Sequence, residues 1–249
     1  MYYCCGITEK GVMPHNEDAL LIGRRIFDMG SDEQTISGAF TAAVSDGVSG
    51  ENSGELASKM CLERLKNADI SGLDTVEENI LAIHHELKEY SKESEDDRNM
   101  QTTLCGVHID DSGAVTAFNV GDSRLYSYQF GRLRQISKDQ SLVQMLIERG
   151  GITASQSRTH IRRNIIFPVI GSHSAEPKVD VSVMSQPMEC GDMLLLCTDE
   201  LSDHVPAMDI QEILDLPKPL PERLSLLVQT ALERRSNDNI SIIAILRQE

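Results

Sequence analysis

Acidic side chains border several apolar runs of this sequence, next to glycine or other small residues. Asp46-Gly47 follows the run 40–45, and Asp199 follows the run 193–198. The other positions of this kind are Asn16-Glu17-Asp18, Gly121-Asp122 and Asn237-Asp238-Asn239. Carboxylate oxygens are the ligands that Mg²⁺ and Mn²⁺ prefer, and both ions usually keep several waters. The set indicates a divalent cation site, although any one Asp-Gly pair alone is more often only a turn.

Two adjacent divalent cations would allow such a site to hydrolyse a phosphate monoester. This ester resists hydrolysis because hydroxide must approach an already anionic phosphorus. A pair of cations offsets that charge and lowers the pKa of a shared water toward neutrality. The bridging hydroxide then attacks phosphorus in line, and no phosphoenzyme is needed.

The acidic residues need strands that end close together. Short runs of β-branched and aliphatic residues, bounded by turn signals, predict such strands. They lie at 20–27, 39–45, 102–109, 114–120, 124–128, 193–197 and 240–246. Asp110-Asp111-Ser112-Gly113 predicts a hairpin turn between two of them. An Asp that follows a strand emerges at the sheet edge, where several strand ends can converge on one cation.

Four segments have the spacing of an amphipathic helix, at 53–67, 74–91, 141–149 and 221–235. Strands come in clusters separated by helical pairs, so they do not alternate strictly with helices. This order favours a layered α/β sandwich with mainly antiparallel sheets over a doubly wound parallel sheet. Because the chain has 249 residues and no evident linker, we expect a single domain, 1–249.

The net charge of −16 argues against binding of nucleic acid and against attachment to anionic lipid, because both need clustered Lys and Arg. The same charge suits a cation-binding protein, or it serves solubility alone. Six cysteines without a CxxC pair predict reduced thiols and no zinc site. There is no signal-peptide pattern and no apolar run of about 18 residues, so we expect a cytoplasmic protein.

The acidic positions belong to longer motifs. These are GVMPHNED at 11–18, SDGVSG at 45–50 with SGE at 53–55, NVGDSR at 119–124, TDEL at 198–201 and NDNI at 237–240. In this order they resemble the motifs of the metal-dependent Ser/Thr protein phosphatases, the PPM or type 2C family, in its bacterial single-domain form. The match covers essentially the whole chain, and five ordered motifs are far more specific than one. Thr102-Thr103 also resembles the family's paired-threonine strand.

The resemblance implies a four-layer α/β sandwich in which helices flank two central, mainly antiparallel sheets, with a flap subdomain at about 141–173. It also implies roles for individual residues. Asp46 would bridge two core metals, and the carbonyl of Gly47 would ligate the second. Asp199 and Asp238 would complete the shell of the first metal, so Asp46, Asp199 and Asp238 are the expected catalytic residues. The expected ions are Mn²⁺ or Mg²⁺, as a pair with room for a third.

Further residues are implied in outer positions. Glu17 and Asp18 would hold metal-bound waters. Asp139 would bind the third, weaker ion, although the chain has Gln140 where the family usually has His. For Asp122 and Arg124, which lie between two predicted strands, we prefer a structural pair that caps a turn.

The chain departs from the family pattern at three positions. Met13 stands where members usually carry an Arg that binds the substrate phosphate. A thioether cannot replace a bidentate guanidinium contact, so substrate affinity should fall by about 1.5–3 kcal/mol. Glu200 replaces a Gly, and would either point outward or enter the metal shell. Ser49 replaces another Gly in the early turn.

Three functions are compatible with these residues. The first is hydrolysis of phosphoserine and phosphothreonine on proteins, in opposition to a Ser/Thr kinase. The second is a catalytically impaired pseudophosphatase that serves as a regulatory binding module, and the third is a hydrolase of small phosphate monoesters. We expect the first, performed by a cytoplasmic monomer on a phosphorylated protein, with no nucleic acid or membrane as partner.

Overall fold

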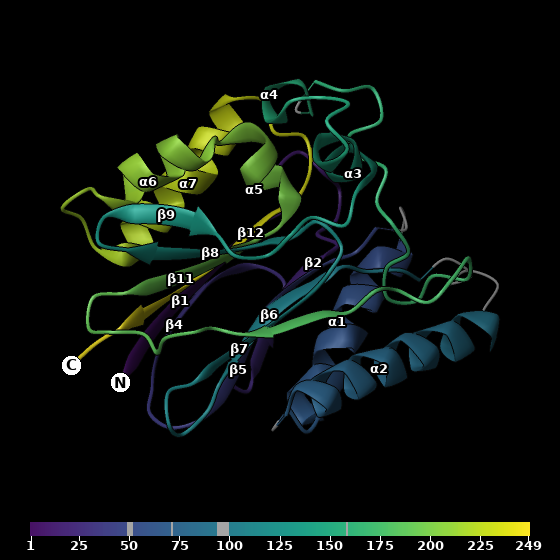
Figure 1. Cartoon of the computed structure of the whole chain (residues 1–249), viewed down its shortest axis with the longest axis horizontal. Coiled ribbons are helices and arrows are strands. Elements are labelled where there is room, and N and C mark those ends of the chain that lie inside the picture. The colour runs from purple at the N-terminus through teal and green to yellow at the C-terminus, as the bar shows by residue number, and fades with distance from the viewer. Residues whose placement is uncertain (49–51, 71, 94–99, 158) are drawn as a thin grey trace.

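The computed structural model describes residues 1–249 except 49–51, 71, 94–99 and 158, so Ser49 and Gly50 of the early turn lie outside the described residues. Two six-stranded sheets lie face to face (Figure 1). The first contains, in order across the sheet, β4 (Gly30–Ile36), β1 (Tyr2–Glu9), β12 (Ile240–Arg247), β11 (Met193–Cys197), β8 (Arg124–Gln129) and β9 (Arg132–Gln135). The second contains β10 (Asp180–Val183), β7 (Val115–Val120), β6 (Leu104–Ile109), β5 (Phe40–Asp46), β2 (Asp18–Ile22) and β3 (Arg25–Phe27).

Helices cover the outer face of each sheet (Figure 1). α1 (Asn52–Asn67) and α2 (Leu73–Glu93) pack on the second sheet. α5 (Asp199–His204), α6 (Ala207–Leu214) and α7 (Leu220–Glu233) pack on the first. α3 (Leu142–Glu148) and α4 (Ala154–Ser157) lie in the segment between β9 and β10. None of the described helices is long and apolar enough to cross a membrane.

Both faces of the central strands are buried, which explains their continuous apolar runs. Successive residues of a strand point to opposite faces. Leu20 therefore packs between the sheets, whereas Leu21 packs against the helices of the second sheet. In the same way Leu194 lies between the sheets and Leu195 faces α5–α7. The strand pairs are antiparallel, so the expected four-layer sandwich of antiparallel sheets is confirmed.

Local predictions are partly confirmed. The turn at 110–113 forms as expected, because Asp110 Oδ1 accepts hydrogen bonds from the N–H groups of Ser112 at 2.8 Å and Ala114 at 2.9 Å. The single strand predicted at 20–27 is wrong, because Gly23 adopts a positive φ of 59° and turns the chain into a hairpin of β2 and β3. The sequence prediction missed β1, β4, β9, β10, α4, α5 and α6. That residues 141–173 act as a flap stays a prediction.

Replacement of a residue between the sheets tests this core. Ile243 is fully buried there, so Ile243→Ala leaves a cavity and should lower the free energy of unfolding in urea by about 2–5 kcal/mol. Ile161 is 95% exposed. The matched control Ile161→Ala should therefore change this free energy by less than about 0.5 kcal/mol. Equal losses for the two variants would contradict the assignment of the core.

Candidate metal centre

Strand pairing in the second sheet brings the first two acidic motifs together. β2 and β5 pair in a register that sets Asp18 directly opposite Asp46. Asp18 opens β2 and Asp46 closes β5, so both lie at the same end of the sheet. Directly opposed residues have Cβ atoms about 4.5–5.5 Å apart. Two motifs that are distant in the sequence are therefore neighbours in the fold.

The first sheet brings two later motifs to its own strand ends. β11 and β12 pair with Cys197 opposite Ile242. Asp199 follows the end of β11, and Asp238 precedes the start of β12. Because the two strands are antiparallel neighbours, both residues lie at the same end of this sheet. Thr198 joins the two sheets at this point, because its Oγ1 donates a hydrogen bond to Asp18 Oδ2 at 3.1 Å.

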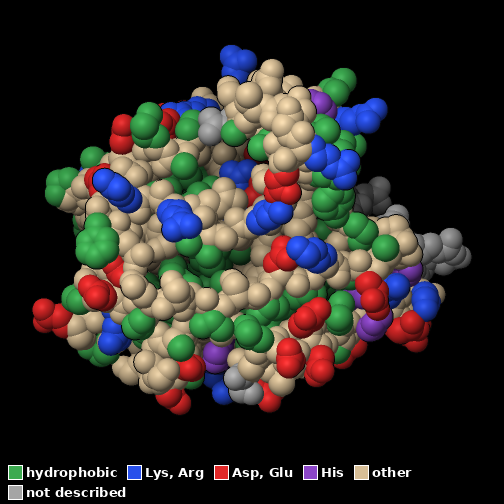
Figure 2. Space-filling model, in the orientation of Figure 1, with side chains coloured by type: hydrophobic (Ala, Val, Ile, Leu, Met, Phe, Trp, Pro, Cys, Tyr) green, Lys and Arg blue, Asp and Glu red, His purple; other side chains and the backbone are tan. Residues whose placement is uncertain are grey.

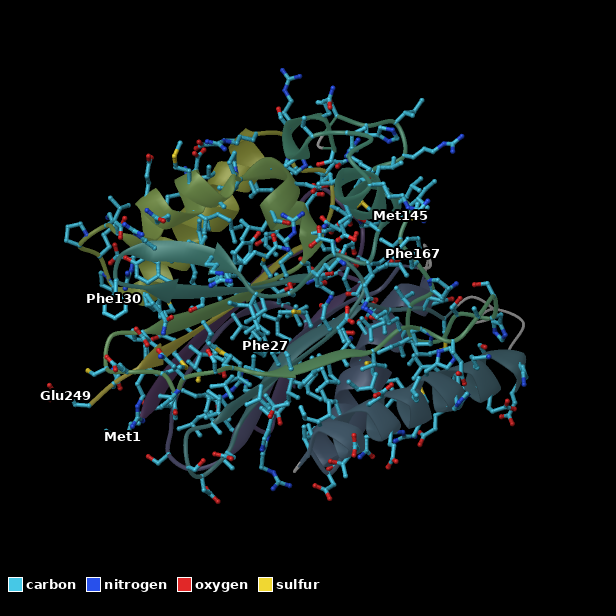
Figure 3. All side chains as sticks on the ribbon, viewed as in Figure 1. Met1, Phe27, Phe130, Met145, Phe167 and Glu249 are labelled. Carbon is cyan, nitrogen blue, oxygen red and sulfur yellow. The ribbon has the colours of Figure 1, made fainter. Side chains whose placement is uncertain are left out.

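A cavity of about 550 Å³ opens between these strand ends. Its lining includes the carboxylates of Glu17, Asp46, Asp122, Asp199 and Asp238, together with Gly47. No Lys or Arg is among the lining residues in the described part of the chain. Phe167, labelled in Figure 3, belongs to an apolar part of the wall formed by residues 166–169. In that view it lies between α3 and α1.

Burial and mutual repulsion raise the pKa of these carboxyl groups. Loss of hydration is the larger cause for Asp46, and the charges of Asp18 and Asp199 raise its pKa further. Burial also raises the pKa of Asp18 to about 7, with a further contribution from Asp238. The pKa of Asp199 is raised by burial and by neighbouring carboxylates. Buried like charges without a counter-charge destabilise the folded state, and a bound cation would relieve this cost.

Hydroxyl groups fix the backbone at Asp46. Thr102 Oγ1 donates a hydrogen bond to the Asp46 carbonyl at 2.8 Å and lies 2.7 Å from Ser45 Oγ. The Asp46 N–H donates to Thr103 Oγ1 at 3.2 Å, and the Thr103 N–H donates to the Asp46 carbonyl at 2.8 Å. The paired threonines therefore hold the main chain of Asp46.

Gly47 permits a close approach between the end of β5 and the start of α1. A Cβ at Gly47 would lie 2.3 Å from the carbonyl oxygen of Gly54. A Cβ at Gly54 would in turn lie 2.3 Å from Glu17 Oε2. Larger side chains at either position would displace the backbone or the Glu17 carboxylate, so both glycines are required by packing.

Asn239 fastens the N-terminal loop to the last motif, a role that the sequence prediction missed. Its Nδ2 donates to the carbonyls of Lys10 and His15, both at 3.0 Å. Its Oδ1 accepts from the N–H of Glu17 at 2.7 Å, and its own N–H donates to Asp238 Oδ1 at 2.8 Å. One buried amide therefore orients two of the acidic motifs. The sequence signal that could have indicated this role is the position of Asn239 between the predicted metal ligand Asp238 and a predicted strand.

Asp139 lies outside the large cavity and is already paired. Arg124 donates from Nε to Asp139 Oδ1 at 3.0 Å and from Nη2 to Oδ2 at 2.6 Å. The expected pair of Asp122 with Arg124 is therefore wrong. Asp122 instead lines both the large cavity and a smaller one of about 210 Å³, which Asp139 and Asp199 also line. Burial, followed by the charge of Asp139, raises the pKa of Asp122 to about 7.

Met13, Glu200 and Gln140, which depart from the family pattern, lie in different surroundings. Met13 lines the large cavity. The expectation that Glu200 points outward is wrong, because this side chain is buried. It lines neither cavity, and its entry into the metal shell stays a prediction. Gln140 is structural: its Oε1 accepts from the Gly121 N–H at 3.0 Å, and its Nε2 donates to Asp180 Oδ2 at 2.9 Å.

The donor set of the large cavity fits hard divalent cations, because five carboxylates line it. Within the described residues, no group of three or more Asp, Glu, His or Cys side chains closes around one point. The carboxylates instead surround a space with room for water, and Mg²⁺ and Mn²⁺ usually retain several waters. Such a site would hold hydrated ions at its wall. That Asp46, Gly47, Asp199, Asp238, Glu17, Asp18 and Asp139 are metal ligands stays a prediction.

The raised pKa values predict how the stability depends on pH in EDTA. Asp18 has a folded-state pKa of about 7, whereas the unfolded chain titrates near the ordinary value of about 3.9. Between these values the folded state binds more protons. The melting temperature in EDTA should therefore rise as the pH falls from about 8 to about 6. At pH about 8, Mn²⁺ at about a hundred times its Kd should add about 2.7 kcal/mol of stability.

The control is the double variant Asp46→Asn/Asp199→Asn, in which the dependence on pH in EDTA should be weaker. The same dependence in the double variant and the parent would show that these carboxylates do not cause it.

Sequence comparison finds similar proteins over almost the full chain, although no family model matches. Serine/threonine phosphatase Stp of Listeria monocytogenes serotype 4b is 33% identical over 250 residues, which cover 96% of this chain and 94% of that protein. PstP, a serine/threonine protein phosphatase of Mycobacterium tuberculosis, is 28% identical over 221 residues, which cover 86% of this chain and 41% of that protein.

Solved structures have the same fold. The serine/threonine phosphatase of S. agalactiae matches with a TM-score of 0.85 and 24% identity, with 100% of both chains covered. PstP/Ppp of M. tuberculosis matches with a TM-score of 0.83 and 26% identity, again over 100% of both chains. The catalytic domain of PstP in complex with two manganese ions matches over 100% of both chains with a TM-score of 0.79 and 26% identity. The protein therefore belongs to the bacterial PPM family of serine/threonine phosphatases.

Proposed function

We propose that the protein is a metal-dependent phosphatase that hydrolyses phosphoserine and phosphothreonine on proteins. The observation that carries this proposal is a cavity lined by five carboxylates and, in the described chain, by no Lys or Arg. A phosphate group would be repelled there unless cations bound first. The relatives that act on Ser/Thr phosphate support a protein substrate over a small metabolite. The intact acidic motifs favour an active enzyme over a pseudophosphatase.

We assign the ligands of an Mn²⁺ or Mg²⁺ pair to Asp46, the carbonyl of Gly47, Asp199 and Asp238. Two manganese ions in the related PstP catalytic domain support this number. Glu17 and Asp18 would hold waters of the ions. For a third, weaker ion we propose Asp139 as a ligand, in the smaller cavity that Asp122 and Asp199 also line together with Arg124 and Arg163.

When bound, the ion pair would neutralise the phosphate and lower the pKa of the water that attacks phosphorus in line. The chain itself contributes position and shape. The hydroxyls of Thr102 and Thr103 hold Asp46, and Asn239 holds the loop that carries Glu17. Residues 166–169 form an apolar part of the cavity wall. None of these groups needs to form a covalent bond with the substrate.

We further propose a cytoplasmic monomer that opposes a Ser/Thr kinase. The six cysteines are free, as expected in a reducing compartment. The charge of −16 disfavours nucleic acid and anionic lipid as partners. In the view of Figure 2, acidic side chains gather over α1 and α2. Cell fractionation and light scattering of the purified protein test the location and the oligomeric state.

Activity tests the proposed function directly. Purified protein should hydrolyse a phosphothreonine peptide and p-nitrophenyl phosphate with Mn²⁺ and not with EDTA. Asp46→Ala and Asp199→Ala should each lower kcat by at least about a hundredfold, because each removes a ligand. Asp74→Ala, at an exposed position of α2, is the matched control and should leave kcat unchanged. Tight Mn²⁺ binding without turnover of either substrate would instead identify a pseudophosphatase.

Met13 gives a prediction about substrate affinity. Because Met13 lines the cavity, an Arg at this position would reach the phosphate. Met13→Arg should lower KM for p-nitrophenyl phosphate by about tenfold or more, since a charge-assisted hydrogen bond contributes about 1.5–3 kcal/mol. Val12 is 73% exposed and does not line the cavity, so Val12→Arg is the control for added charge. The same KM for both variants would mean that position 13 does not contact the phosphate.

A further inference from the structure

Glu200 joins two parts of the metal centre without facing the cavity. It is the second residue of α5, directly after Asp199, and it is 8% exposed. Its Oε1 accepts hydrogen bonds from the N–H of Asn237 at 2.6 Å and from the N–H of Asp238 at 3.1 Å. His204 Nε2 lies 3.2 Å from the same oxygen. A residue that replaces the family's Gly has therefore acquired three polar contacts.

The segment that carries Asp238 needs such support. Asp238 is exposed and lies between the end of α7 at Glu233 and the start of β12 at Ile240, so no helix or strand holds its backbone. Arg235 within this connection has a positive φ of 68°, a conformation that costs energy for a residue other than glycine. A carboxylate that accepts two successive N–H groups fixes the direction of the peptide planes on both sides of Asn237.

We propose that Glu200 is a positioning residue, which sets the distance and orientation of Asp238 relative to Asp199 before a cation binds. Asp199 is fixed by the end of β11 and the start of α5, and Glu200 extends from the same turn to the backbone of Asp238. Groups that orient metal ligands in this way typically change metal affinity by about 10–100-fold when they are removed. The inference rests on the metal-dependent function proposed above.

This role also explains why an additional carboxylate is tolerated beside Asp199. Its Oε1 accepts hydrogen bonds from two backbone N–H groups and lies 3.2 Å from His204 Nε2, and the residue lines neither cavity. A purely structural cap would make the same hydrogen bonds. The two roles differ in one measurable respect: a cap contributes stability alone, whereas a positioning residue also contributes to the affinity for the ion.

The first experiment is hydrogen exchange on the metal-free protein. In Glu200→Ala the amides of Asn237 and Asp238 should exchange at least about tenfold faster than in the parent, because their acceptor is gone. The amide of Ile243, within β12, should keep its protection. Unchanged exchange at both positions would overturn the proposal, since Glu200 would then not hold this backbone.

The second experiment is calorimetric titration with Mn²⁺ alone. Glu200→Ala and Glu200→Asp should bind Mn²⁺ about 10–100-fold more weakly, because the first lacks the acceptor and the second is too short to reach it. Glu200→Gln keeps an oxygen at the same position and should stay within about fivefold of the parent. Glu212→Ala, an exposed Glu on α6, is the matched control and should bind as the parent does.

Two outcomes would overturn the proposal: affinity within about twofold of the parent in both Glu200→Ala and Glu200→Asp, or a loss in Glu200→Gln as large as in Glu200→Ala. If Glu200→Ala fails to fold, the comparison of Glu200→Asp with Glu200→Gln decides. Neither measurement uses a phosphorylated substrate. A failure of the proposed function would appear separately, as absence of hydrolysis by a parent protein that still binds Mn²⁺.

Discussion

The repulsion among carboxylates that face one cavity is the constraint on which the rest of the structure depends. Burial and neighbouring charges push Asp46 and Asp199 toward their neutral forms. A loosely held set of such groups would move apart. The register of β2 and β5 and the bond from Thr198 to Asp18 prevent this movement. This repulsion lowers the stability of the metal-free fold. A bound cation relieves it, so the same repulsion raises the affinity for the cation.

The groups that hold the centre act mainly on the backbone. Thr102 contacts the backbone through its hydroxyl, Asn239 through its amide and Glu200 through its carboxylate. The three residues come from different parts of the chain. Main-chain contacts fix where a ligand side chain begins without occupying all of its oxygens. The contacts from Thr102 and Glu200 thus use none of the carboxylate oxygens of Asp46 and Asp238, the metal ligands that we propose. Preorganisation and free coordination sites are compatible for this reason.

The layers and the acidic motifs could be predicted from the sequence, because both depend on local patterns of apolar residues, glycine and Asp. β4 was missed because it is a polar strand at the sheet edge, with the sequence GSDEQTI. Asp122 was misjudged because the partner of Arg124 is supplied by Asp139, 15 positions away. The role of Glu200 depends on a contact across 37 positions. Such contacts follow from the packing of distant elements, which local patterns do not contain.

The pairing of β1 with β12 has a consequence for biosynthesis. These strands, the first and last of the described chain, are neighbours inside the first sheet along eight paired residues, from Tyr2 opposite Arg247 to Glu9 opposite Ile240. During translation β1 leaves the ribosome long before its partner exists, and contacts between such distant segments form slowly. Asp238 lies two residues before the start of β12. A nascent chain therefore cannot bring Asp238 beside Asp199 until β12 has emerged and paired with β11.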